Sequence, residues 1–254
     1  MVEVSLWGLA SVGGVCAGIA AVAYRKKLLD ATGIVAAVAV GLVIGVLGHP
    51  AWLGVLLFYM VSSFAATKYR FERKRQMGVA EGQRGERTWR NVVANGAPPA
   101  SIAALAGLFP QAFPPGASGY IFLTAIAVAA ADTLASEVGV LSPRAVLITR
   151  PRRTVAPGTN GGVSRLGQAA ALAASSYVAL TGFFVFALFA PTTLAANWPY
   201  LLVPVAFGFL GCQVDSVMGA TLELGGRTTK GWVNFLSIAI STGLAWGALW
   251  LLPP

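Results

Sequence analysis

The chain is poor in the residues that carry most soluble enzyme chemistry. Its 254 residues include one histidine, two cysteines and nine acidic residues, and 11% are charged, whereas soluble domains average about 25%. His49 has no second histidine or cysteine nearby, so a zinc or haem site has little support. Cys16 and Cys212 stand alone in apolar stretches and indicate neither a disulfide framework nor a metal pair. Acid–base and metal chemistry would therefore rest on carboxylates.

Apolar residues make up 56% of the chain, and the mean hydropathy is +0.72, which indicates a multi-pass integral membrane protein. The first apolar run has no lysine or arginine before it and is of full length, so we expect a retained span rather than a signal peptide. Eight segments are each close to the ~20 residues that a helix needs to cross hydrocarbon: about 4–23, 33–48, 51–67, 93–110, 119–138, 165–190, 199–219 and 232–252. We predict an all-α bundle of about eight spans, a single membrane domain over residues 1–254. Six or seven spans stay open as an alternative, if residues 33–67 form a re-entrant pair.

The net charge of +9 is confined to alternate connections between these segments. All 18 lysines and arginines lie within or at the edges of four loops, about 24–32, 68–92, 139–164 and 220–231. The positive-inside rule makes these loops cytoplasmic and puts both termini outside. Because the charge is not spread over one soluble face, nucleic acid is not an expected partner. The longest of the four loops, 68–92, either anchors anionic lipid headgroups or binds substrate.

Three of the nine acids lie inside apolar segments. A charge at membrane depth costs roughly 2.5–3.5 kcal/mol, so it persists mainly where it faces a cavity, a partner or an ion. The predicted topology puts Asp132, Glu137 and Asp215 near the cytoplasmic ends of their spans. Asp132 and Ser136 share a helix face, whereas Asp132 and Glu137 are about 140° apart and should not grip one ion. The simplest site has Asp132 and Asp215 holding Mg²⁺ from two helices.

The cytoplasmic sequence RRTVAPGTNGGVS supplies a complementary feature. Its glycines let backbone N–H groups approach an anion, its arginines can neutralise phosphate charge, and its neutral donors precede the positive end of the next helix. We therefore expect a phosphate-binding loop made of Arg152, Arg153, Gly158, Thr159, Asn160, Gly161, Gly162 and Ser164. A glycine-rich turn by itself is common, and the Walker A sequence is absent. Together with the acids, it favours phosphoryl or nucleotidyl transfer to a lipid-borne acceptor, chemistry that needs positioning and charge neutralisation.

Four short sequences, in this order among apolar spans, resemble the plant phytyl-phosphate kinase family of integral membrane proteins. They are ANG (94–96), ADTLASEVG (131–139), PGTNGGVS (157–164) and DSVMGA (215–220), and the resemblance covers residues from about 31 to 240. It implies a CTP-using kinase that converts a prenyl monophosphate, such as phytyl or geranylgeranyl phosphate, to its diphosphate. The family is also distantly similar to dolichol and phytol kinases and to CDP-diacylglycerol synthases. Asp132 and Asp215 match its metal-holding acids, and Arg153 through Gly162 match its nucleotide loop.

The leading hypothesis is thus a Mg²⁺-dependent kinase in the cell membrane, with its active site facing the cytoplasm and with CTP or another nucleoside triphosphate as donor. The expected catalytic residues are Asp132, Asp215, Arg153 and Glu137. The expected substrate-binding residues are Asn95, Lys68, Arg70, Ser136 and Ser216. A membrane cytidylyltransferase making a CDP-lipid would use the same site. An ion-coupled transporter is a third hypothesis, and acids that only lock helices together a fourth. Small residues in the spans permit close helix packing, within one copy or in a homo-oligomer.

Overall fold

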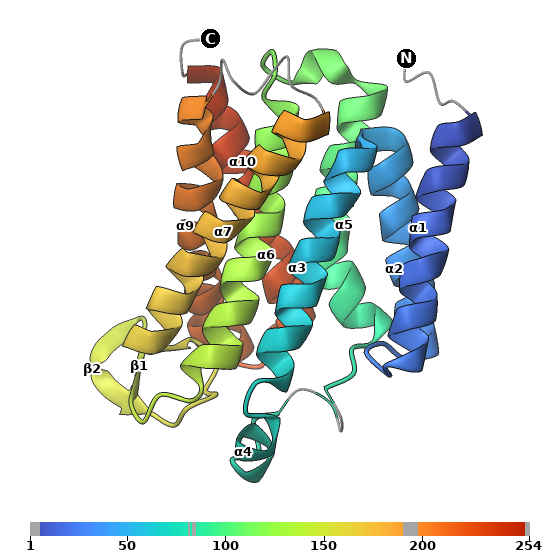
Figure 1. The fold of residues 1–254 in the computed structure, drawn as a ribbon. Helices are drawn as coiled ribbons and strands as arrows, with labels where there is room; N and C mark the ends of the chain where they lie inside the picture. Colours follow the sequence, from blue (N-terminus) through green and yellow to red (C-terminus); the bar gives the residue numbers. More distant parts are fainter. Residues whose placement is uncertain (1–5, 81, 83–84, 190–197, 252–254) are drawn as a thin grey trace.

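The computed structural model describes residues 6–80, 82, 85–189 and 198–251, and it is a bundle of long helices (Figure 1). These are α1 (Leu6–Arg25), α2 (Ala31–Val43), α3 (Pro50–Lys68), α5 (Trp89–Leu108), α6 (Ser118–Gly139), α7 (Arg165–Phe189), α9 (Leu202–Met218) and α10 (Lys230–Leu251). Two of them continue as short π-helical turns, η1 (Ile44–Gly48) after α2 and η4 (Gly219–Glu223) after α9. Shorter elements are α4 (Phe71–Gln76) and the 3-10 turns η2 (Pro110–Ala112) and η3 (Trp198–Leu201).

The predicted all-α membrane bundle is confirmed, and each of the eight apolar segments corresponds to one long helix. Seven helices in the described part of the chain are long and apolar enough to cross a membrane. The eighth, α5, falls outside that set and carries Pro98 and Pro99 in its interior. It nevertheless packs against α2, α6 and α10 within the bundle. The residues expected as a re-entrant alternative form two separate helices, α2 with η1 and then α3, and both are candidate spans. The predicted connection 191–198 lies almost wholly outside the described residues.

Helix α6 is the centre of the bundle and contacts α3, α5, α7, α9 and α10. Its residues from Tyr120 to Ala131 are all buried, as expected for a helix that is apolar on every side. Small residues on its neighbours permit this close packing. A Cβ atom at Gly208 of α9 would lie 2.7 Å from the Ala127 side chain, so this position leaves no room for a larger residue. The C-terminal turns of α6 are thereby held in a fixed place.

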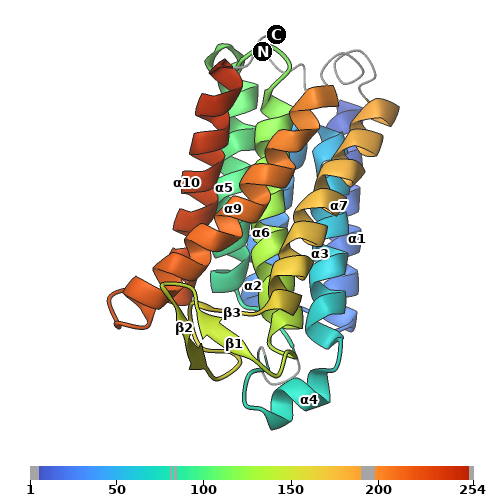
Figure 2. The ribbon, with the colours of Figure 1, turned by 90° about the vertical axis from the view of Figure 1, so that its left-hand side faces the viewer.

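The four basic connections lie at one end of the bundle, called here the basic end, while α1 begins and α10 ends at the other (Figures 1 and 2). The segment 139–164, expected to be a loop, contains a small antiparallel sheet at this end. It comprises β1 (Ala145–Leu147), β2 (Arg150–Val155) and β3 (Gly162–Val163) in the order β2-β1-β3. The sheet carries the glycine-rich turn, so the turn has a rigid base.

Candidate active site

A cavity of about 260 Å³ opens at the basic end between α6, α7, α9, η4 and the turn that joins β2 to β3. We call it the glycine-turn cavity. Its lining includes the acids and most of the loop residues expected from the sequence. Those residues are Asp132, Ser136, Glu137, Gly158, Thr159, Asn160, Gly161, Gly162, Ser164, Asp215 and Ser216. The structure therefore places the two intramembrane acids and the glycine-rich segment around one cavity.

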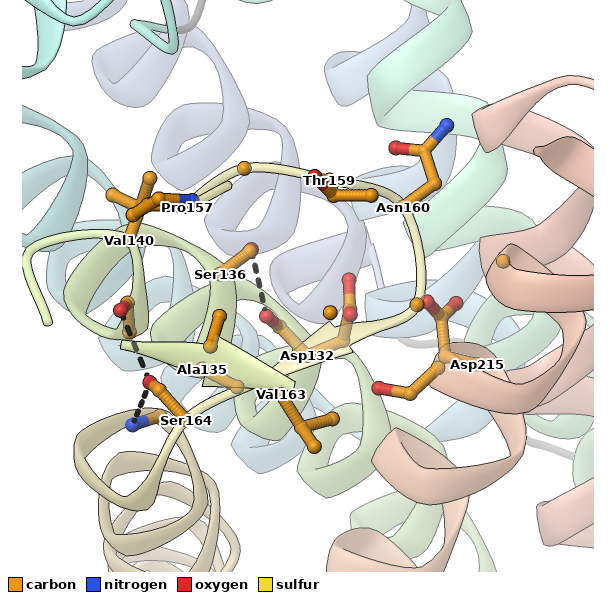
Figure 3. Close-up of a pocket in the computed structure, with 18 of the residues that line it drawn as sticks. Asp132, Ala135, Ser136, Val140, Pro157, Thr159, Asn160, Val163, Ser164 and Asp215 are labelled. Carbon is orange, nitrogen blue, oxygen red and sulfur yellow. Dashed lines mark hydrogen bonds between the residues drawn. The ribbon is translucent and has the colours of Figure 1, made fainter. Parts of the chain in front are cut away.

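Asp132 of α6 and Asp215 of α9 lie next to each other beneath the turn (Figure 3). Their carboxyl groups are close enough for a side-chain hydrogen bond between them. Helix α10 supports both acids. Ser237 Oγ donates to Asp215 Oδ2 at 3.0 Å, and Asn234 Nδ2 lies 3.4 Å from Asp132 Oδ2. Two carboxylates this close repel each other unless a proton or a cation lies between them.

This acid pair suits a cation that keeps part of its coordination shell for other ligands. Among the described residues, no group of three or more His, Cys, Asp and Glu side chains is arranged to hold a metal. Mg²⁺ is commonly bound by one or two carboxylates, with water and substrate phosphates as the other ligands. The carboxylates of Asp132 and Asp215 fit that mode of coordination.

The turn over the acids is fixed by close contacts that require glycine. Gly158 and Gly161 have φ values of +85° and +72°, which glycine adopts without strain. A side chain on Gly161 would collide with Ala220 of η4, and one on Gly158 would come within 2.6 Å of Val79. A side-chain hydrogen bond also joins Asn160 to Glu223 of η4. The turn is thus held against η4 on one side and against the segment after α4 on the other.

Ser164 ties the turn to two helices. Its hydroxyl donates to the Gly139 carbonyl at the end of α6, at 3.0 Å, and accepts from the Gly167 N–H of α7, at 3.1 Å. The second bond caps the α7 N-terminus, where N–H groups lack helical partners. Gly139 and Gly167 make the junction possible, because a Cβ on Gly139 would lie 2.9 Å from the Gly167 Cα. Ser164 therefore positions the turn relative to Asp132.

Glu137 lines the cavity and also forms a buried ion pair that the sequence analysis missed. Lys74 of α4, which is fully buried, donates to Glu137 Oε2 at 2.6 Å. The same ammonium donates to the carbonyls of Ala66 and Thr67 at the end of α3, at 2.9 and 2.8 Å. Thr67 Oγ1 donates to Glu137 Oε1 at 2.8 Å. Both oxygens of Glu137 are thus engaged in fastening α4 to α3 and α6.

Comparison with known proteins assigns the chain to a family. Residues 14–246 match the family described as Integral membrane protein DUF92. The chain belongs to this family. The DUF92 protein is 31% identical to Protein PGR of Arabidopsis thaliana over 220 residues, 80% of this chain and 75% of that protein. It is 32% identical to an uncharacterized membrane protein of Synechocystis sp., over 86% of this chain and 83% of the other. It is also 30% identical to Protein VTE6, chloroplastic, of Arabidopsis thaliana, over 62% of this chain and 47% of that protein. No solved structure matches it.

These matches confirm the family resemblance drawn from the short motifs. The matched region of the DUF92 protein contains every residue singled out as a candidate from the sequence. The matches assign roles to none of those residues. The roles therefore rest on the geometry of the cavity.

Five candidate residues, four cations and one asparagine, do not line the glycine-turn cavity. Arg152 and Arg153 are exposed on β2, the strand of the sheet that pairs only with β1 among the described strands. Lys68 and Arg70 are exposed beside α4, with Lys68 Nζ 5.4 Å from the centre of the Phe71 ring. Asn95, from α5, lines a neighbouring polar pocket together with Asp132. The structure therefore brings the acids and the glycine turn together but not the four predicted cations.

Among the described residues, Lys230 is the cation that lines the cavity, and the sequence analysis did not select it. It is the first residue of α10, where a positive charge opposes the helix dipole. That placement is a signal the sequence contained. Asn234, Ser237 and Ser241 form a second such signal, because spacings of three and four residues put them on one face of an otherwise apolar helix.

Proposed function

We propose that this DUF92 protein transfers the γ-phosphoryl group of CTP to a prenyl monophosphate, giving the prenyl diphosphate and CDP, at the cytoplasmic face of the membrane. An oxygen of the lipid monophosphate attacks the γ-phosphorus, and the bond between that phosphorus and the β–γ bridging oxygen breaks. The observation that carries the proposal is the facing pair Asp132 and Asp215 beneath a glycine turn, at the basic end of a membrane bundle. The family resemblance supplies the nucleotide and the lipid class.

In this proposal, Asp132 and Asp215 bind Mg²⁺, which supplies charge neutralisation for the phosphates when it is bound. Asn234 and Ser237 keep the two carboxylates oriented from α10. The N–H groups of the glycine turn and the ammonium of Lys230 contact the nucleotide phosphates from the other walls of the cavity. The side chains of the chain therefore bind and align the reactants, which is the main task in phosphoryl transfer.

The scarcity of histidine and cysteine agrees with this chemistry. A phosphate monoester, whose second pKa is near 6, is already an anion at neutral pH and needs no general base to become a nucleophile. A serine or sugar hydroxyl as acceptor would need one. Among the described residues, the titratable side chains lining the cavity are mainly carboxylates, and the two central ones are assigned here to Mg²⁺ rather than to proton transfer. An acceptor that is already ionised therefore suits it best.

The test uses the purified full chain with Mg²⁺, γ-labelled CTP and geranylgeranyl monophosphate. We expect label in a lipid diphosphate, and we expect Asp132→Asn to abolish its formation. Asp30→Asn is the matched control, because Asp30 is an N-cap outside the cavity and asparagine caps helices equally well. Label released as pyrophosphate, with cytidine in the lipid, would replace the kinase by a cytidylyltransferase. Absence of transfer from any nucleotide would refute the proposal.

A further inference from the structure

The glycine-turn cavity adjoins a small polar pocket, which in turn adjoins a small apolar pocket. A polar pocket of about 30 Å³ shares Asp132, Ser136, Glu137 and Lys230 with the cavity. On its other side, it shares Arg87, Asn91 and Asn95 with an apolar pocket of about 60 Å³ between α2, α3 and α5. The three spaces thus form a row that runs from the glycine turn, past Asp132, to an apolar end.

The apolar pocket leads away from the basic end into the bundle. Its apolar lining comprises Leu29, Ala37, Val40, Leu56, Met60, Phe64 and Val92. Along α3, the distance from Phe64 to Leu56 is eight residues, or about 12 Å of helix. Tyr59 also lines this pocket, and its buried hydroxyl has no hydrogen-bond partner among the described residues. The pocket is therefore narrow, elongated in the direction of the helices and mainly hydrocarbon-like.

Arg87 stands where the polar and apolar pockets meet. Its backbone is fixed, because its N–H donates to the Leu28 carbonyl at 3.0 Å and its carbonyl accepts from the Asp30 N–H at 3.1 Å. Its guanidinium lies 5.4 Å from the centre of the Phe64 ring and 3.4 Å from Thr67 Oγ1. Within the described part of the chain these contacts leave most of the five N–H donors for a ligand.

The polar pocket has the charge and the unsatisfied group expected of a ligand site. Asp132 and Glu137 both line it; the ion pair with Lys74 neutralises Glu137, and Asp132 is the carboxylate assigned above to Mg²⁺. Among the described residues, Arg87 and Lys230 are the cations in its lining. Asn234 also lines the pocket, is 8% exposed, and has a buried Oδ1 without a partner among the described residues. A buried acceptor without a donor is costly, so we expect an ordered water there, through which a phosphate dianion, itself without a hydrogen to donate, could contact Asn234.

We propose that these two pockets are the acceptor site, with Arg87 binding the phosphate of a prenyl monophosphate and the apolar pocket holding the isoprene units next to it. This inference rests on the proposed function for the identity of the lipid. A phosphate on a linear apolar chain matches the order of surfaces, cationic and then apolar, at the depth where a headgroup meets hydrocarbon. The acceptor phosphate then reaches the donor cavity past Asp132, which lines both spaces. Lys68 and Arg70, expected in this role from the sequence, line neither pocket.

The test is direct binding of tritiated geranylgeranyl monophosphate, and of geranylgeraniol for comparison, to the full chain in nanodiscs without nucleotide. The wild type should bind the monophosphate more tightly than the alcohol. Arg87→Gln should lower affinity for the monophosphate about 10- to 100-fold and leave the alcohol unchanged, since a charge-assisted hydrogen bond is lost. Arg87→Lys should recover part of that loss. Ala37→Phe should weaken binding of both lipids, whereas Ala39→Phe, two residues along the same helix but exposed, should not.

If Arg87→Gln and Ala37→Phe both bind the monophosphate with wild-type affinity, the assignment of the acceptor site is overturned. Equal binding of monophosphate and alcohol by the wild type would overturn the role of Arg87. Because no nucleotide is present, the result is independent of turnover. If the variants behave as expected but the wild type transfers no phosphoryl group from any nucleotide, the proposed function fails and the lipid-phosphate site stands.

Discussion

The buried pair between Lys74 and Glu137 gives a stringent test of how the basic end is assembled. The side chains are 1% and 11% exposed, so solvent screens them little. Removing one partner of a buried ion pair typically costs about 3–5 kcal/mol, because the other charge is left uncompensated. Lys74→Met also removes the two hydrogen bonds to the Ala66 and Thr67 carbonyls. We expect a loss of stability at the upper part of that range.

The assay is thermal unfolding of the purified protein in detergent, together with limited proteolysis by trypsin. A loss of about 3–5 kcal/mol should lower Tm by roughly 6–20 °C. Release of α4 should also expose its arginines to trypsin before the bundle unfolds. The double variant Lys74→Met/Glu137→Leu should recover much of the loss, because neither charge then stays buried alone.

The control is the second ion pair of α4. Arg75 and Glu72 are 3.0 Å apart, but their side chains are 64% and 68% exposed. Exposed pairs contribute about 0–1 kcal/mol, so Glu72→Gln should leave Tm and the trypsin pattern nearly unchanged. Equal shifts for Glu72→Gln and Glu137→Gln would refute the reasoning, because burial would then not determine the cost. So would a double variant less stable than Lys74→Met alone.

Two further predictions concern the glycine turn and the opposite end of the bundle. Gly161→Ala should abolish turnover, because the new Cβ would collide with Ala220. Gly226→Ala is the control: Gly226 also has a positive φ, +69°, but no atom lies within 4 Å of its Cβ position, so this variant should lose only about 1 kcal/mol of stability. Equal turnover in both variants would contradict the role of the contact with Ala220. Burial lowers the pKa of His49, whose Nδ1 accepts from the Ala51 N–H at 3.1 Å. The unfolded chain therefore binds this proton more readily than the folded chain, so His49 should lower Tm as the pH drops below about 6.5 and leave it unchanged above that pH. His49→Asn should reduce the slope of Tm against pH in the acidic range. An unchanged slope would exclude His49 as its source.

The spans could be predicted because hydrocarbon leaves the backbone few choices. Every buried N–H and C=O must be paired within its own segment, so a long apolar run is a helix almost regardless of its detailed sequence. Even α5, which is outside the seven candidate spans, corresponds to a predicted apolar segment, 93–110, and counting it as a span is what makes the charges of the connections alternate. The short elements α4 and β1–β3 lie in aqueous loops, where this constraint is absent. None of these elements is longer than six residues, and none shows a clear apolar period, so the sequence predicts loops there.

The acids could be predicted for the same reason, since a carboxylate in an apolar run has a high cost that something must offset. Cations in a loop carry no such signal. Arg152 and Arg153 are adjacent to the glycine turn in sequence, yet both are exposed on β2. Helix α4 has six residues, three of them basic, and only the fold shows that Lys74 is the buried one. Proximity along the chain was therefore a poor guide to proximity in the site.

The arrangement of α6 explains how donor and acceptor could be kept apart until they react. Asp132, Ser136 and Glu137 line the glycine-turn cavity on one side and the polar pocket on the other. The helix that carries them is buried along most of its length and surrounded by five others, so this wall cannot move without repacking the core. The other walls of the cavity include the glycine turn and the segment after α4, which contacts Gly158 through Val79. A nucleotide that enters beneath the turn would therefore meet a lipid phosphate across a fixed partition, with Asp132 as the residue common to both.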